Sequence, residues 1–141
     1  MTTKRLIHDW APAVLWAAVI LAASNQSFSA EHTDTWVHEI FTRFSGLPLS
    51  EETLEIINFV VRKLSHLTEY GIFSALTFRA LRGDREGWSS RWAIPAIVLS
   101  VALAAIDEFH QTFVPGRTGV VTDVLIDGCG ATIAQLLTRH L

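Results

Sequence analysis

The sequence has little charge, a single cysteine and no long basic run. Only 18% of its 141 residues are charged, and the formal net charge is −3. Without a basic patch the chain lacks the electrostatic footprint of a nucleic-acid-binding protein, so no nucleic acid is expected as a partner. The lone Cys129 excludes an intramolecular disulfide, and its place in an apolar run favours a role as a small packing residue.

Apolar residues are what the chain has in abundance, since 50% of its sequence is hydrophobic. A chain this short and apolar fits a small polytopic membrane protein better than a soluble domain with a polar shell. Four apolar segments, at about 6–23, 58–80, 92–113 and 120–138, are each near the ~20 residues that cross a bilayer. We therefore predict an all-α fold, an integral membrane bundle of four transmembrane helices in a single domain over residues 1–141.

The first apolar segment also has features of a signal peptide, because Lys4 and Arg5 precede it and small residues follow it. Those small residues do not form a clean A-x-A cleavage site, so a retained helix is the preferred interpretation. The tryptophans fall mostly at the ends of the segments, and we interpret them as anchors in the membrane interface.

Two further helix signals lie between the first and second segments. The apolar residues at 36, 37, 40, 41 and 44 form one stripe, which favours a short helix in the membrane interface, with an ordinary loop helix as the alternative. Ser50 followed by Glu51 and Glu52 then predicts a helix start that continues to about Leu81.

Basic residues predict the orientation. They gather near the start of the first segment, between the second and third, and at the end of the fourth: Lys4, Arg5, Arg79, Arg82, Arg85, Arg91 and Arg139. Four spans place all of these on one side, which the positive-inside rule makes cytoplasmic. We predict the cytoplasmic (inner) membrane as the location, with both termini in the cytoplasm.

Ionisable residues interrupt the last three segments, where a mid-helix carboxylate costs about 2.5–3.5 kcal/mol on insertion scales. In the predicted topology they share one depth, toward the extracytoplasmic side. Helical spacing also places Asp123 and Asp127 on the face of Gly130 and Ala134, a small-residue surface suited to helix packing. The acids should therefore face the interior of the bundle. Together with the amide of Gln111, the set comprises Arg62, Lys63, His66, Glu69, Asp107, Glu108, Asp123 and Asp127.

These positions resemble the VanZ-like family of membrane proteins. The matching patterns are R-K-x-x-H-x-x-E-Y at 62–70, D-E-x-x-Q-x-F-x-P-G-R at 107–117 and D-x-x-x-D-x-x-G at 123–130. The sequence departs from the family at Asp127, where Asn is frequent, and at Ala134, where a second Gly is common. The resemblance implies a cell-envelope role. The founding member is associated with tolerance to teicoplanin, a lipid-bearing antibiotic that binds peptidoglycan precursors outside the cell.

Three functional classes remain open, and the first is an enzyme. Its catalytic residues would be His66, Glu69, Asp107 and Glu108, with Arg62 and Arg117 holding a phosphate. The acids could also hold a divalent metal, with Mg²⁺, Mn²⁺ or Ca²⁺ favoured by oxygen ligands and Zn²⁺ admitted by a histidine. The candidate metal ligands are Glu69, Asp107, Glu108, Asp123 and Asp127.

The second class is a binding protein that holds the headgroup of an envelope lipid or a peptidoglycan precursor. Its ligand-binding residues would be Arg62, Lys63, Gln111, Arg117, Asp123 and Asp127. The third class is a proton-relay transporter, which four spans without an internal repeat support only in an oligomer.

A structural alternative is that the charges only pair with one another across the helices. Arg62 or Lys63 would pair with Glu69, and Arg117 with one of the acids of the last two segments. Buried ion pairs stabilise a fold no better than apolar packing does, and intramembrane ionisable clusters are functional by default. We therefore favour a functional site that binds or modifies an envelope ligand.

Overall fold

The chain folds into helices only. The computed structural model describes residues 3–24, 39, 43, 50–114 and 119–140. Within them the chain forms four helices and no strand: α1 (Thr3–Ala23), α3 (Glu51–Arg82), α4 (Ser90–Gln111) and α5 (Val121–Thr138). The all-α prediction is confirmed, and each predicted segment falls on one helix. The apolar stripe of the predicted interfacial helix lies outside the described residues.

The predicted start of α3 is confirmed in detail. The Ser50 hydroxyl accepts a hydrogen bond from the Thr53 backbone N–H at 3.3 Å, as an N-cap does. The helix ends where Gly83 adopts a φ of 61°, and the Gly83 N–H donates to the Arg79 carbonyl. At 1.5 Å per residue its 32 residues extend about 48 Å, which exceeds the thickness of about 30 Å of a bilayer core.

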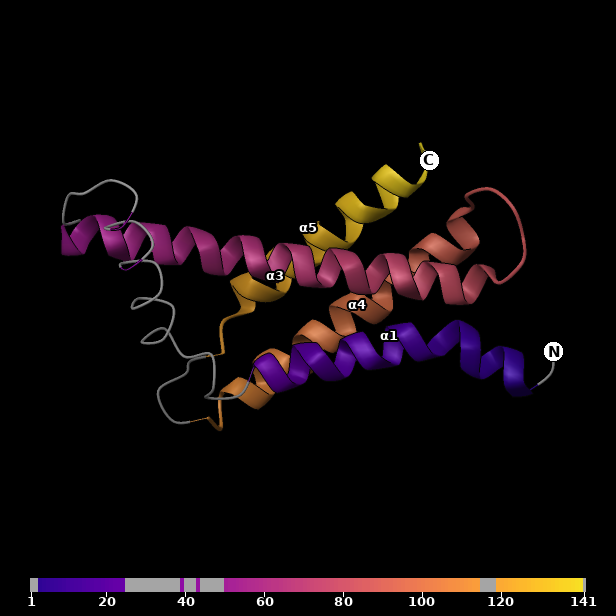
Figure 1. Ribbon diagram of the computed structural model, residues 1–141, viewed down its shortest axis with the longest axis horizontal. Helices are drawn as coiled ribbons and strands as arrows, with labels where there is room; N and C mark the ends of the chain where they lie inside the picture. Colours follow the sequence, from indigo (N-terminus) through magenta and orange to yellow (C-terminus); the bar gives the residue numbers. More distant parts are fainter. Residues whose placement is uncertain (1–2, 25–38, 40–42, 44–49, 115–118, 141) are drawn as a thin grey trace.

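Successive helices run in alternating directions (Figure 1). The start of α1, the α3–α4 connection and the end of α5 lie at one end of the molecule, which we call the basic end. There Arg5 forms an ion pair with Asp84, and the guanidinium of Arg139 lies over the ring of Trp88 at 5.4 Å. The other end, which we call the acidic end, contains the end of α4 and the start of α5 (Figure 1).

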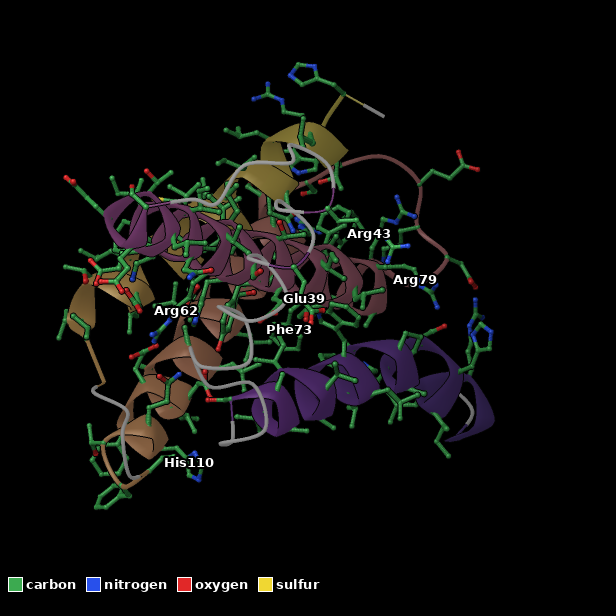
Figure 2. All side chains as sticks on the ribbon, turned by 60° about the vertical axis from the view of Figure 1, so that its left-hand side comes forward. Glu39, Arg43, Arg62, Phe73, Arg79 and His110 are labelled. Atoms are coloured by element: carbon green, nitrogen blue, oxygen red, sulfur yellow. The ribbon has the colours of Figure 1, made fainter. Side chains whose placement is uncertain are left out.

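Helix α3 is the centre of the bundle, because it packs against α1, α4 and α5. A core cluster joins Ala13 and Ile20 of α1 to Tyr70 and Phe73 of α3 and Ala104 of α4. Phe73 lies between α3 and α1 (Figure 2). Helix α1 therefore supports the face of α3 that lies away from α5.

Helices α3 and α5 cross at a point where their backbones touch. A Cβ atom built on Gly130 would collide with the backbone of Leu67, and one built on Gly71 would lie 3.3 Å from the Gly130 carbonyl oxygen. Only glycine permits so close an approach. The small-residue face predicted for α5 is thus the face that contacts α3.

A set of hydrogen bonds between buried polar side chains of α3 and α5 continues this contact toward the basic end. The Gln135 side-chain amide donates to the Ser74 carbonyl at 3.0 Å and to the Ser74 hydroxyl at 2.8 Å. The Ser74 hydroxyl in turn donates to the Ala131 carbonyl at 3.1 Å. These bonds fix the register of α3 against α5, and they were not predicted from the sequence.

The interior of the described bundle is as polar as it is apolar, whereas large apolar side chains point outward from all four helices. Such an inversion is typical of a protein whose solvent is lipid. Two helices, α1 over Arg5–Ala23 and α4, are long and apolar enough to be candidate membrane spans.

Cys129 is exposed on α5, so its interpretation as a packing residue is wrong.

Candidate functional site

Helices α3, α4 and α5 bring six ionisable or amide side chains together inside the bundle. Each is at most 9% exposed: His66 of α3, Asp107, Glu108 and Gln111 of α4, and Asp123 and Asp127 of α5. Arg62 and His110 lie toward the acidic end of the bundle and Arg79 toward the basic end (Figure 2). The polar set therefore lies toward the acidic end of the bundle; that this end faces outward stays a prediction.

The centre of the site is formed by His66, Glu108 and Asp127, one residue from each helix. The His66 Nδ1 atom lies 3.2 Å from the Asp127 Oδ1 atom, and the two make an ion pair when the imidazole is protonated. One ligand atom from each of the three residues falls within 4.8 Å of the other two. The His66 ring also stacks on Tyr70 at a centroid distance of 6.5 Å, which restrains the imidazole.

Asp123 has a different environment from Asp127. It forms an ion pair with Lys63, and its Oδ2 atom lies 4.0 Å from the Arg62 guanidinium. The structural alternative paired these cations with Glu69, so that expectation is wrong. Asp123, in the first turn of α5, is the acid that reaches both cations of α3, and this contact ties the two helices together.

The acids at the end of α4 are held by amide donors. The Gln111 side-chain amide donates to Asp107 at 3.1 Å and to Glu108 at 3.3 Å. The Val120 backbone N–H donates to the other carboxylate oxygen of Glu108 at 2.8 Å. Because Val120 is the N-cap of α5, Glu108 satisfies a donor at a helix start and joins α4 to α5.

Two predicted site residues are placed differently from the rest. Glu69 is half-buried, one turn along α3 from His66, and its backbone carbonyl accepts a hydrogen bond from the Trp16 indole at 2.9 Å. Trp16 thus binds α1 to the site, which corrects its interpretation as an interface anchor. Arg117 lies outside the described residues.

A groove of about 360 Å³ opens between α4 and the start of α5. Glu108 is the one charged residue in its wall, so a single carboxylate belongs both to the groove and to the buried centre. The volume falls in the range of about 300–1,000 Å³ that is usual for ligand sites. The lining residues are Ala105, Glu108, Phe109, Thr112, Gly119, Val120, Val121 and Val124.

The polar groups span the region that also matches a known protein family. A family model described as VanZ/LLP1 matches residues 10–141, which include every helix of the site. The chain belongs to the VanZ/LLP1 family. The resemblance seen in the sequence is confirmed, and family membership together with the apolar α1 and α4 identifies a membrane protein. Neither the curated proteins nor the solved structures contain a significant match.

In this VanZ/LLP1 chain, sequence reasoning missed Ser74, Gln135 and Trp16. The signal for the first two was visible, because Ser74 and Gln135 are polar residues inside apolar runs. No local pattern indicated the Trp16 contact, which joins residues 53 positions apart.

Proposed function

We propose that this VanZ/LLP1 protein crosses the cytoplasmic membrane four times and binds a phosphate-bearing envelope lipid at its outward-facing polar site. The observation that carries the proposal is Glu108, whose carboxylate lines the apolar groove and also belongs to the buried polar centre. A lipid combines an apolar chain with a polar head. A groove with apolar walls and one carboxylate that also belongs to the charged centre fits both parts.

Cations at the rim of the site support a phosphate as the head. Lys63 and Arg62 converge on Asp123, and their side chains stay 21% and 43% exposed. Charged donors of this kind make the strong hydrogen bonds by which proteins hold phosphate. The proposal extends to tolerance of glycopeptides such as teicoplanin, since those antibiotics act on lipid-linked precursors at the same membrane face.

Filling the groove is expected to expel the lipid. Ala105→Trp would place a large ring in the groove, whereas Ala102→Trp, one turn earlier on the outward face of α4, leaves the groove open. We expect native mass spectrometry of the detergent-purified protein, incubated with a polyprenyl phosphate, to show at least tenfold less bound lipid for Ala105→Trp. Equal occupancy in both variants, at equal melting temperature, would contradict binding in the groove.

The orientation can be tested by labelling single cysteines in intact cells, in a Cys129→Ser background. We expect an impermeant maleimide to label Glu52→Cys, near the acidic end, and not Glu86→Cys in the α3–α4 connection, because the basic end should face the cytoplasm. Glu86 is used because its neighbour Asp84 is paired with Arg5. Labelling of Glu86→Cys from outside would reverse the topology.

One contact also favours chemistry on the bound lipid as a second function. The Asp127 carboxylate beside His66 Nδ1 is the arrangement that orients an imidazole for general acid–base work. A change in the mass of the lipid after incubation with the wild-type protein, absent with His66→Gln, would distinguish an enzyme from a binder.

A further inference from the structure

The three residues at the centre of the site have the donor set of a metal centre. His66 offers an imidazole nitrogen, and Glu108 and Asp127 each offer a carboxylate oxygen, all within 4.8 Å of one another. Ligand bonds of about 2.1 Å in a tetrahedron place neighbouring ligand atoms about 3.4 Å apart. The distance from His66 Nδ1 to Asp127 Oδ1 is 3.2 Å, close to that edge.

Asp127 is also short of partners. Its side chain is 1% exposed, yet neither of its carboxylate oxygens accepts a hydrogen bond from another described residue. The His66 Nδ1 atom lies 3.2 Å from the Asp127 Oδ1 atom, and it too has no hydrogen-bond partner among the described residues. Buried carboxylates normally have their acceptor positions satisfied. Asp127, whose close partner is an imidazole that pairs with it only when protonated, is therefore suited to hold a ligand together with His66.

The balance of charge leads to the same conclusion. Lys63 and Arg62 are both directed at Asp123, which leaves the other acids with His66 as their only close cationic group among the described residues. Those acids are Glu69, Asp107, Glu108 and Asp127. Like charges gathered in one buried site repel one another. A divalent cation would remove most of that repulsion.

We infer that His66, Glu108 and Asp127 bind a divalent transition-metal ion, with Zn²⁺ preferred over Mn²⁺ and with Mg²⁺ and Ca²⁺ bound weakly. The imidazole selects against the hard ions, and the order of the others follows the usual affinities of mixed nitrogen and oxygen sites. The structure supplies three ligands, as catalytic zinc sites do, so a fourth position is open to an outside group.

The open position connects the metal to the proposed function, on which this part of the inference rests. A phosphate that enters along the groove meets Glu108 and would be repelled by the acids alone. A metal ion at the same point turns the repulsion into a bond to a phosphate oxygen. The acids and the phosphate can then occupy one site.

The test is metal binding by the full chain in detergent, without lipid, using a purification tag free of histidine. We expect about one Zn²⁺ per chain by elemental mass spectrometry after dialysis, and a Mn²⁺ signal in electron paramagnetic resonance that Zn²⁺ displaces. His66→Gln, Asp127→Asn and Glu108→Gln should each weaken Zn²⁺ binding by at least about 100-fold, since even outer-shell partners of a metal are worth about 10–100-fold.

Two matched controls should bind the metal as the wild type does. His110→Gln removes an exposed histidine at the end of α4, and Glu52→Gln removes an exposed acid at the start of α3. A wild-type protein that holds no Zn²⁺ or Mn²⁺ at neutral pH, or equal loss of metal in the controls, overturns the metal site. If the wild-type protein binds lipid but no metal, the metal site is overturned and the proposed function stands. If the wild-type protein binds metal but no lipid, only the proposed function is overturned.

Discussion

Gly130→Ala is expected to unfold this protein or to separate α5 from α3, although it adds a single methyl group. The new Cβ would collide with the backbone of Leu67, which cannot move aside as a flexible side chain can. Overpacking usually costs about 1–3 kcal/mol, and a clash between backbones belongs at or above the upper value. Asp127 lies one turn before Gly130, so the same displacement would pull it away from His66.

The matched control is Gly128→Ala on the same helix. An added Cβ there meets only one methyl group of Val101, at 3.3 Å. Replacing a helical glycine by alanine otherwise gains about 0.5–1 kcal/mol, so this variant should melt at or above the wild-type temperature. Melting temperature and monodispersity in detergent provide the measurement. A Gly130→Ala protein as stable as Gly128→Ala would mean that the two helices do not touch there.

The features that could be predicted from the sequence are those that depend on a local pattern within one helix. Ser50 with two following acids predicted the start of α3, and helical spacing predicted that Asp123 and Asp127 face inward with Gly130. Both rest on the geometry of a single helix, in which residues one turn apart share a face. The inward direction followed because charge is costly in lipid.

Which side chains pair between helices could not be predicted from the sequence. Lys63 pairs with Asp123, which only the crossing of α3 and α5 brings close; Glu69, six positions along α3, lies beyond the spacing of three or four residues at which helical side chains pair. The hydrogen bond from Gln135 to Ser74 and the groove, whose walls come from two helices, likewise depend on how the helices cross. The position of the crossing depends on two glycines 59 positions apart, Gly71 and Gly130, each of which is unremarkable alone.

The second large effect is expected from variants that neutralise an acid without changing its shape, and these distinguish a working site from a structural one. Asp107→Asn is expected to reduce retention of a polyprenyl phosphate, and any tolerance to teicoplanin in cells, by at least tenfold, because Asp107 adds to the negative charge that holds the inferred metal ion, to which the phosphate would bind. Its stability should be unchanged or higher, because an amide in place of a buried acid removes a desolvation cost. Gln111 can still donate to the amide oxygen, so no hydrogen bond is lost. Glu69→Gln should behave in the same way.

Asp123→Asn should do the opposite, because Lys63 and Arg62 lose their charged partner. Breaking a buried pair costs about 3–5 kcal/mol, and the partial exposure of both cations reduces this to about 2 kcal/mol. Adding Lys63→Met should restore much of the melting temperature, since no buried ammonium then remains. If Asp107→Asn loses lipid retention only in proportion to lost folded protein, as Asp123→Asn does, then all of these acids serve to hold the helices together. If the two variants diverge as expected, one bundle contains both an ion pair that joins α3 to α5 and an excess of negative charge kept for a ligand.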